Sequence, residues 1–520
     1  MLQRGPVRER NVEDEVELVE NGTYPPNGSA KEEKAGLVSG IVGERSMEAG
    51  GEGGTLNTRD KRALALLVAL YLLQGIPVGL AFGSIPFLLR SKLSYSQIGI
   101  FTLCTYPYSL KLLWSPIVDS IFSPKLGRRK SWIVPIQTIV GLLFWWLGNN
   151  VQQMMEVEEP NVHLLTGLFF TLVFFAATQD IAVDGWALTL LSKENLSYAS
   201  TAQTIGLNTG YFLSFTVFLA FNSVEFSNKY FRSSPLDYPL ISLSGYLHFW
   251  AFAFVAVTAY LAVFQPEDPV TAQDQDDMDL KKVYSIMVEI CKLKHVQSFM
   301  IVHLVTKLGT AANDAATSLK LLEKGLKKED LALAVLIDFP FQILFGYLAA
   351  KWSKGEKPLR PWLIAMWTRL GWAAISMLLI SNFPQGDIGT WYFLLVVACT
   401  VGSSFSSTVQ FLLNTVSNLG GTWPKFFVLK GIDAFSVAVC HVKDEGLDVI
   451  VSSRECVSDH GKAACAELGG TCLTERDGYY WVSTLCILTG VAILVSFVQP
   501  VARRLQTLPA AAWRIKRNGR

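Results

Sequence analysis

The sequence predicts an all-α membrane protein in which twelve transmembrane helices form two six-helix bundles. Three observations support this fold class. Half of the 520 residues are hydrophobic and 17 % are charged, whereas soluble domains contain roughly 25 % charged residues. The apolar residues gather in long runs, and a helix needs about 20 apolar residues to cross a bilayer. A long polar connector at residues 266–295 separates six runs from another six.

Each apolar run predicts one membrane-spanning helix. The predicted spans are residues 62–83, 97–119, 131–149, 164–184, 198–221, 246–264, 296–316, 331–350, 361–380, 391–413, 424–440 and 479–499. Some spans contain proline, for example Pro77, Pro107 and Pro340. Membrane helices tolerate proline where neighbouring helices or water satisfy the freed backbone groups. We therefore expect kinks at most of these positions.

The spans define the predicted domain organisation. Residues 1–60 are rich in Glu, Gly, Asn and Pro, which is the composition of a disordered tail. The predicted parts are a disordered cytoplasmic tail (1–60), an N-terminal six-helix bundle (61–265), a cytoplasmic linker (266–295), a C-terminal six-helix bundle (296–500) and a basic cytoplasmic tail (501–520).

The distribution of lysine and arginine predicts the orientation, because cytoplasmic loops are enriched in these residues. The even-numbered loops carry 14 of them and the odd-numbered loops carry 12. Arg59, Lys61 and Arg62, together with six cations after Pro500, tip the balance. Both termini are therefore expected in the cytoplasm. The seventh loop is the weak point, because four lysines lie between residues 317 and 330.

A cysteine-bearing loop at residues 441–477 is expected on the opposite side of the membrane, where oxidation is allowed. The four cysteines in or next to it are Cys440, Cys456, Cys465 and Cys472. Four thiols allow three pairings, and the sequence leaves all three open. His441 and His460 would be needed for a zinc site, but the spacing matches no common zinc pattern. We therefore predict disulfides and no metal.

Charged residues inside the spans are the strongest indication of function, because each is expensive in lipid and needs a partner or a wet cavity. Lys111, Lys307 and Arg369 are the candidate cations for an anionic substrate. Arginine suits bidentate contact with phosphate, and lysine acts as a point charge. The ninth span usually lies outside the central ring in such folds, so Arg369 is expected either to reach the substrate or to brace Asp338.

Polar and aromatic residues near these cations complete the predicted substrate site. His303 and Lys307 share one helix face with Thr310 and Asp314 because they are spaced by four, three and four residues. A structural alternative is an ion pair between Lys307 and an aspartate. Aromatic rings beside a cation could stack an adenine ring. The further candidates are Tyr106, Tyr108, Asn208 and Gln410.

A gate is predicted at the cytoplasmic end of the fourth span. Asp180 and Asp184 are four residues apart and share one helix face. We expect them to pair with Arg128 or Arg129 in the basic loop that follows Asp119. The alternative is a proton-coupling role, because two carboxylates this close can hold a proton between them.

Several other classes of function are excluded or disfavoured. No Walker-type glycine loop is present, so ATP-driven transport is not expected. No concentrated basic domain suggests a nucleic-acid partner. No cofactor motif and no catalytic constellation are recognisable, and we predict that the protein is not an enzyme.

Four motifs resemble those of the acetyl-coenzyme A transporter family, and bacterial muropeptide permeases share parts of them. The motifs are Gln74-Gly-Ile-Pro, Lys111-Leu-Leu-Trp-Ser-Pro-Ile-Val-Asp119, Leu126-Gly-Arg-Arg-Lys-Ser-Trp132 and Thr178-Gln-Asp-Ile-Ala-Val-Asp-Gly-Trp186. In one respect the chain departs from the general superfamily pattern, since Gly127 follows Asp119 by eight residues rather than three.

The resemblance implies a major facilitator fold in the endoplasmic reticulum membrane. It implies transport of acetyl-CoA from cytosol to lumen, with CoA as an exchange partner, to supply acetyl groups for lumenal acetylation. Residues 441–477 would then be a lumenal loop. A homodimer is also consistent with it. The alternatives are transport of another anionic metabolite, such as a glutathione-type peptide or a saccharide-peptide, or a non-transporting membrane acetyltransferase or scaffold.

Overall fold

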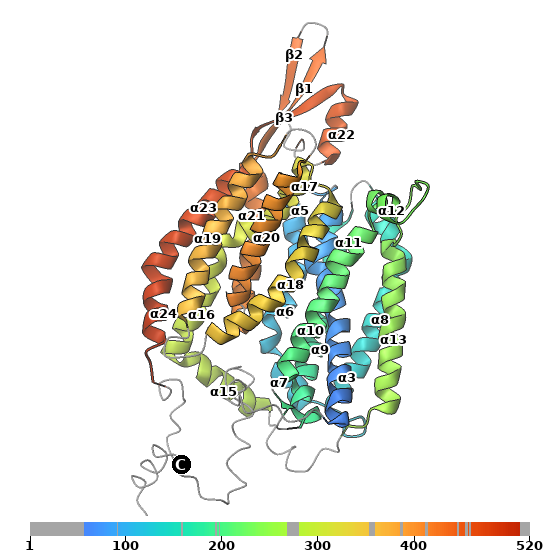
Figure 1. Cartoon of the computed structure of the whole chain (residues 1–520), viewed down its shortest axis with the longest axis vertical. Helices are drawn as coiled ribbons and strands as arrows, with labels where there is room; N and C mark the ends of the chain where they lie inside the picture. Colours follow the sequence, from blue (N-terminus) through green and yellow to red (C-terminus); the bar gives the residue numbers. More distant parts are fainter. Residues whose placement is uncertain are drawn as a thin grey trace, which may run out of the picture.

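The computed structural model is a helical molecule with a small sheet at one end of its long axis (Figure 1). Most helices run along that axis. The structure describes residues 57–509 except 91, 158–159, 193–194, 197, 268–279, 353–358, 385–387, 411–413, 445–446, 453–455 and 457–458. Of the two chain tails predicted to be cytoplasmic, residues 1–56 and 510–520 therefore lie outside the described residues.

Helices coincide with all six predicted spans of the N-terminal half. They are α3 continuing into α4 (Thr58–Gly79 and Ile85–Leu89), α5 to α7 (Tyr95–Thr102, Tyr106–Leu110 and Ser115–Ser120), α8 (Lys130–Glu156), α9 (Val162–Leu190), α10 with α11 (Tyr198–Phe212 and Phe218–Phe221) and α13 (Leu243–Phe264). A short helix, α12 (Val224–Tyr230), lies between α11 and α13.

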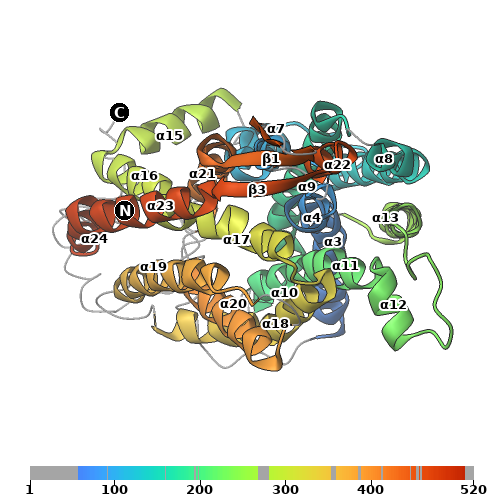
Figure 2. The same cartoon turned by 90° about the horizontal axis from the view of Figure 1, so that it is seen from above.

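The C-terminal half repeats this pattern. Its helices are α16 with α17 (Lys294–Thr306 and Ala311–Lys324), α18 (Lys328–Trp352), α19 (Arg360–Ser381), α20 (Thr390–Gln410), α21 (Asn414–Phe435) and α23 with α24 (Gly478–Ile493 and Gln499–Leu505). The connector ends in α15 (Leu280–Lys292), at the end of the molecule opposite the sheet. From above, α19, α23 and α24 lie on one side and α8 and α13 on the other (Figure 2).

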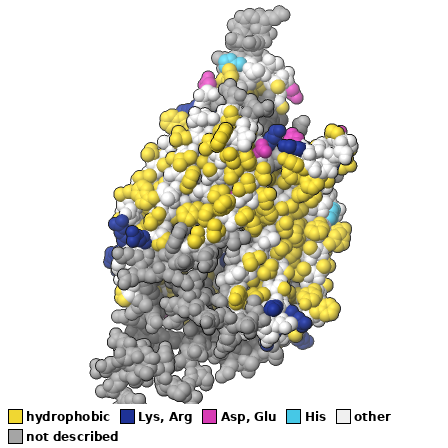
Figure 3. Space-filling model, in the orientation of Figure 1, with side chains coloured by type: hydrophobic (Ala, Val, Ile, Leu, Met, Phe, Trp, Pro, Cys, Tyr) yellow, Lys and Arg dark blue, Asp and Glu magenta, His cyan; other side chains and the backbone are white. Residues whose placement is uncertain are grey.

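The outer surface is that of a membrane protein. Within the described residues, eight helices are long and apolar enough to cross a bilayer. Hydrophobic side chains form a broad band on the face shown in Figure 3, and charged side chains lie above and below it. Bulky apolar residues such as Trp145, Trp146 and Phe252 are exposed on the outside of the molecule. A lipid environment explains their exposure, because no soluble fold leaves so many large apolar groups in water.

Small residues allow the helices of the N-terminal bundle to pack closely. Gly75 on α3 faces Gly210 on α10, and a Cβ atom added at Gly210 would lie 2.2 Å from the carbonyl oxygen of Leu72. Membrane helices associate through such small-residue contacts because lipid provides no hydrophobic drive between them. The close contact holds α10 against α3 and thereby brings Gln203 toward the site described below.

Two membrane-crossing segments change helix type at a lysine. The segment α5–α7 contains a 3-10 turn at Lys111–Leu113, and the segment α16–α17 contains one at Lys307–Thr310. Such turns in the middle of a helix often mark functional positions. The seventh helical segment is also longer than predicted, since α17 continues to Lys324.

The predicted eleventh span is wrong at its C-terminal end. It was placed at 424–440, but α21 runs from Asn414 to Phe435 and the apolar residues after it form strand β1 (Val437–Asp444). A short apolar run does not distinguish a strand from a buried helix end. With β2 (Leu447–Ser452) and β3 (Gly470–Arg476), β1 forms an antiparallel sheet in the order β2-β1-β3.

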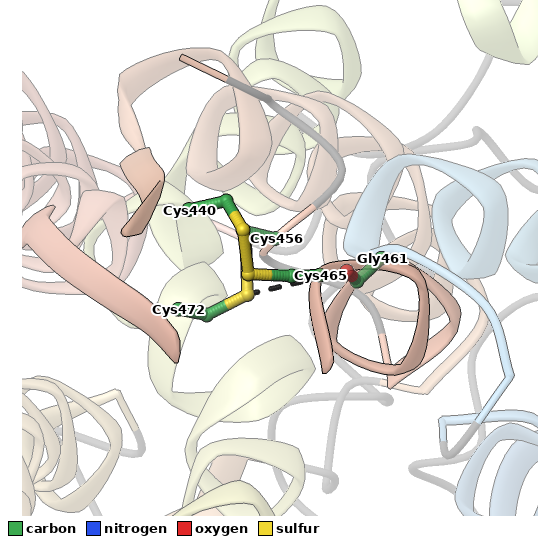
Figure 4. Close-up of a disulfide and its surroundings, with 5 residues drawn as sticks. All are labelled: Cys440, Cys456, Gly461, Cys465 and Cys472. Carbon is green, nitrogen blue, oxygen red and sulfur yellow. Dashed lines mark hydrogen bonds between the residues drawn. A yellow bond between two sulfur atoms is a disulfide. The ribbon is translucent and has the colours of Figure 1, made fainter. Parts of the chain in front are cut away.

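Two disulfides hold this small subdomain together. Cys440 pairs with Cys465, and Cys456 pairs with Cys472 (Figure 4). The helix α22 (Asp459–Glu467) carries Cys465 and lies beside β3. This result confirms the prediction of disulfides and selects one of the three pairings that the sequence left open. We call residues 437–477 the sheet subdomain.

Candidate functional site

An ion-pair cluster occupies the centre of the N-terminal bundle. The 3-10 turn places the ammonium group of Lys111 against α9, where it bonds the carboxylate of Asp180 and lies 3.9 Å from that of Asp184. The side chain of Asp180 is fully buried, and that of Lys111 is 18 % exposed. The amide of Gln74 on α3 donates to the other carboxylate oxygen of Asp180.

Asp184 forms the accessible end of this cluster. Its side chain is 40 % exposed, in contrast to that of Asp180. The Tyr71 hydroxyl donates to its Oδ1 at 2.7 Å, and the Gln203 amide donates to the same oxygen at 2.8 Å. The three helices α3, α9 and α10 therefore converge on one carboxylate, which stands one helical turn from Asp180.

The predicted partners of these aspartates need correction. Arg129 forms its ion pair with Asp119 at 2.6 Å, and Arg128 lies 3.9 Å from the same carboxylate. The cation that the ion pairs of Asp180 and Asp184 share is Lys111. The sequence assigns Lys111 to substrate binding and the two aspartates to a gate, because it does not reveal how close the second span lies to the fourth.

The basic loop is held by a residue that the sequence analysis missed. The carboxylate of Glu267 accepts hydrogen bonds from the backbone amides of Arg129 and Lys130, at 2.7 and 2.9 Å. These amides begin α8, where carboxylates are favourable because the amides have no partner within the helix. Gly127 has a φ of +96°, and a Cβ atom there would lie 2.3 Å from Glu267 Oε2.

A second cluster lies in the C-terminal bundle and is rich in cations. Arg369 on α19 donates to Asp314 on α17 at 2.6 Å. Lys307, Arg369 and Lys425 lie close enough to Asp314 or to one another to interact electrostatically. Lys307 and Arg369 are buried, and Lys425 is half-buried. Lys307, Arg369, Lys425 and Asp314 thus lie together, and we call these four residues the cationic cluster.

Two predictions about this half are changed by the geometry. Arg369 was expected to brace Asp338, but it pairs with Asp314, while Asp338 accepts from Ser404 at 2.6 Å and from Gln342 at 2.7 Å. His303 does not continue the polar stripe of Lys307, because its ring packs 5.3 Å from that of Trp362 on α19. The 3-10 turn after Thr306 interrupts the helical spacing on which the stripe was based.

The remaining candidates differ in how well the structure places them. Tyr108 lies under Lys111, with the ammonium nitrogen 5.3 Å from the ring centroid. Tyr106 is half-buried on the same short helix α6. Asn208 is half-buried on α10. Gln410 ends α20, but its side chain lies outside the described residues. Their predicted contact with substrate stays a prediction.

Lys425 is a member of the cationic cluster that the sequence analysis missed but could have identified. It stands on α21, which begins ten residues before the predicted eleventh span. The predicted span begins at 424, so Lys425 lies at its very edge and is counted with the basic residues of the preceding loop, not with the buried cations. A sharper signal was available, since residues 414–435 contain the breaks Gly420, Gly421 and Pro424, as several functional membrane helices do.

The two bundles are joined at the end that carries the sheet subdomain. Arg90, after α4, pairs with Glu323 on α17 at 2.8 Å, and the Tyr95 hydroxyl donates to the same oxygen. Lys320 bridges Glu323 and Asp477 at 2.7 and 2.6 Å. We call these five residues the sheet-end network. Arg90, Tyr95 and Lys320 of this network are buried. Lys320 was predicted in the seventh loop, but it lies within helix α17.

Two further hydrogen bonds join the N-terminal half to helix α21. The backbone amide of Ser96 donates to Asp433 on α21 at 2.6 Å. The hydroxyl groups of Ser109 and Thr422 lie 2.8 Å apart. The sheet subdomain starts just after Asp433 and ends at Asp477, so both of its attachment points neighbour contacts between the two bundles.

Comparison with known proteins agrees with this geometry. The family model described as acetyl-coenzyme A transporter 1 matches residues 63–276, 270–360, 356–413 and 411–515. An uncharacterized membrane protein of Saccharomyces cerevisiae is 39 % identical, over 90 % of this chain and all of the relative. The anhydromuropeptide permease of Escherichia coli is 23 % identical, over 68 % of this chain and 71 % of the permease.

Solved structures share the fold at low identity. The nucleoside transporter NupG superposes with a TM-score of 0.52 at 11 % identity, covering 84 % of this chain and 99 % of NupG. A bacterial homologue of the human lysosomal transporter Spinster superposes with a TM-score of 0.50 at 13 % identity, covering 86 % of this chain and 98 % of that protein.

Eight described helices are long and apolar enough to cross a membrane, and the solved structures show the major facilitator fold. With the family match, these findings define a multi-pass membrane transporter. The match with the family model extends from residue 63 to residue 515 in overlapping pieces. The chain belongs to the acetyl-coenzyme A transporter 1 family.

Proposed function

We propose that this protein is a secondary transporter that moves acetyl-CoA from the cytosol into the lumen of the endoplasmic reticulum. Transport would occur by alternating access, with residues 61–265 rocking against residues 296–500, and CoA as the exchange partner. Membership of the family supports the substrate. The two disulfides of the sheet subdomain support placing that subdomain in an oxidising lumen, and hence both termini in the cytosol.

The cationic cluster is the observation that carries this proposal. Lys307, Arg369 and Lys425 lie around the carboxylate of Asp314, so three buried or half-buried cations gather in one region of the C-terminal bundle. Buried cations are expensive in a bilayer and usually mark a substrate pathway. Acetyl-CoA carries several phosphate oxygens, and arginine and lysine are the residues that bind such groups.

The N-terminal bundle provides the second face of the proposed site. Lys111 lies over the ring of Tyr108, so a cation and an aromatic surface stand side by side. An adenine ring can stack on such a surface, and a phosphate can contact the ammonium group. A substrate with both groups would therefore bridge the two bundles, with the phosphates shared between Lys111 and the cationic cluster.

Uptake of labelled acetyl-CoA into proteoliposomes tests this function. Wild-type protein is expected to accumulate acetyl-CoA, and the variants Lys307→Ala and Lys425→Ala are expected to lower uptake at least tenfold, because a lost charged contact amounts to about 1.5–3 kcal/mol. Lys430→Ala is the matched control, since Lys430 is an exposed lysine on the same helix as Lys425. It should transport as wild type does.

Three results would contradict the proposal. Absence of uptake or exchange by well-folded wild-type protein would remove acetyl-CoA as substrate. Stronger inhibition by glutathione-type peptides or by saccharide-peptides than by unlabelled acetyl-CoA would point to another anionic cargo. Wild-type uptake by Lys111→Ala and Lys307→Ala together would show that the assigned site is wrong.

A further inference from the structure

The ion-pair cluster of Lys111, Asp180 and Asp184 contains two carboxylates and one cation. Lys111 is the cation in contact with both Asp180 and Asp184. Arg129 also acts electrostatically on Asp184, but its own ion pair at 2.6 Å is with Asp119. Two carboxylates one helical turn apart thus face one ammonium group. Carboxylates that share a site in this way do not both stay ionised at low cost, and one proton relieves the repulsion.

The hydrogen-bonding groups around the pair suit a carboxyl group that changes its protonation. Gln74 Oε1 is buried and has no hydrogen-bond partner among the described residues, although its amide nitrogen donates to Asp180. A glutamine amide can turn and act as either donor or acceptor, so Gln74 can adapt to a proton held by the aspartate pair.

The groups that face the pair come from every neighbouring element. Lys111 belongs to the 3-10 turn between α6 and α7, and Arg129 precedes α8. Tyr71 on α3 and Tyr108 on α6 are the neighbouring phenols, and Gln203 on α10 donates to Asp184. Tyr71 and Gln203 donate to the same oxygen of Asp184, and its side chain is 40 % exposed. A proton can therefore reach the pair through Asp184.

We propose that Asp180 and Asp184 form a proton-binding site that couples inward transport to proton movement in the same direction. This inference rests on the proposed function and names its coupling ion. When a substrate phosphate contacts Lys111, the two carboxylates lose the cation that balanced them, and a proton from water takes its place. When the substrate leaves, Lys111 returns to Asp180 and the proton is released to water. No covalent bond is made or broken.

The coupling also reduces the charge that crosses the membrane with the substrate. Acetyl-CoA carries several negative charges, and moving each of them against a membrane potential costs free energy. A proton bound at the aspartate pair offsets one of these charges.

Net uptake into proteoliposomes that contain no CoA, under an imposed pH gradient, tests the inference, because returning CoA would carry the proton back. The membrane potential is held at zero by potassium and valinomycin. The readout is the ratio of acetyl-CoA accumulated with and without an inside-alkaline gradient. One coupled proton predicts about a tenfold higher accumulation at equilibrium for each pH unit. Asp180→Asn and Asp184→Asn should each lower this ratio to about one. Asp338→Asn, which changes a buried carboxylate of the other bundle, should keep the wild-type ratio.

Failure of this inference differs from failure of the proposed function. If wild-type protein takes up acetyl-CoA into CoA-free proteoliposomes but ignores the pH gradient, or if both asparagine variants keep the gradient response, the proton site is overturned and the substrate stands. If no exchange occurs, infrared spectroscopy of the purified protein decides the site. The carbonyl band of a protonated carboxyl group should titrate with pH in the wild type and be lost in both asparagine variants. Its persistence in both variants overturns the proposal.

Discussion

Gly127 shows how one residue fixes the cytoplasmic basic loop. Its φ of +96° lies in the left-handed region, which other residues occupy at a cost of roughly 1–2 kcal/mol. The carboxylate of Glu267 occupies the space in which a Cβ atom would stand. The same carboxylate accepts two backbone amides at the start of α8. The glycine therefore allows the end of the sixth span to hold the start of the third.

Replacing Gly127 should destabilise the protein. Gly127→Ala is expected to lower the free energy of unfolding by about 1–2 kcal/mol through backbone strain alone, and by more where the Glu267 carboxylate is displaced. The measurement is thermal unfolding in detergent. Gly167→Ala is the control, because a Cβ atom there meets no atom within 4 Å. Equal melting of the two variants would contradict the role of Gly127.

Single residues were predictable where the physics is local. The cost of a charge in lipid identified Lys111, Lys307, Arg369, Asp180 and Asp184 from the sequence alone. Their partners were not predictable, because an ion pair depends on which helices touch and on how each helix is turned. The two 3-10 turns change that rotation near the two lysines, and no propensity in the sequence indicated them.

At the scale of elements, α17 joins the halves through the sheet-end network. Glu323 on this helix contacts Arg90 and Tyr95 of the N-terminal half, and Lys320 contacts Asp477 at the start of α23. The side chains of Arg90 and Glu323 are 7 % and 20 % exposed. In the alternating-access cycle proposed above, this contact would separate when this end of the transporter opens, and its strength would set part of the energy difference between the two states.

A double-mutant cycle tests the Arg90–Glu323 pair. Removing one partner of a buried ion pair typically costs about 3–5 kcal/mol, because the other charge stays buried. Arg90→Met and Glu323→Gln should each lower thermal stability, and the double variant should lose much less than the two losses added together. Lys229→Met, on the exposed side of α12, should have little effect. Additive losses would show that the two residues act independently.

Hydropathy predicted the helices well and the sheet poorly. Long apolar runs have one stable solution in lipid, which is a helix with all its backbone hydrogen bonds made internally. The apolar run at the C-terminal end of the predicted eleventh span could form either the end of a helix or a strand. Residues 437–440 pair in β1 instead of extending α21, since they leave the membrane region and find β2 and β3 as partners. That pairing involves residues distant in sequence, which hydropathy does not consider.

For the molecule as a whole, the eight cysteines fall into two equal groups. Four form the disulfides of the sheet subdomain, and Cys104, Cys291, Cys399 and Cys486 are free. Under denaturing conditions, a maleimide reagent should therefore modify four thiols before reduction and eight after it. Gel mobility shifts count the modified thiols. Eight reactive thiols before reduction would contradict the disulfides and the placement of the subdomain in an oxidising compartment.

The connectivity of these disulfides has a consequence for biosynthesis. Along the chain the first cysteine of the subdomain pairs with the third, and the second with the fourth. A nascent chain that ends before Cys465 has no native partner available for either Cys440 or Cys456, and these two can form a non-native bond with each other. Thiol exchange must then undo that bond, through attack by a later thiolate. Maturation of the subdomain therefore depends on synthesis past Cys472 and on the disulfide isomerases of the cell that makes the protein.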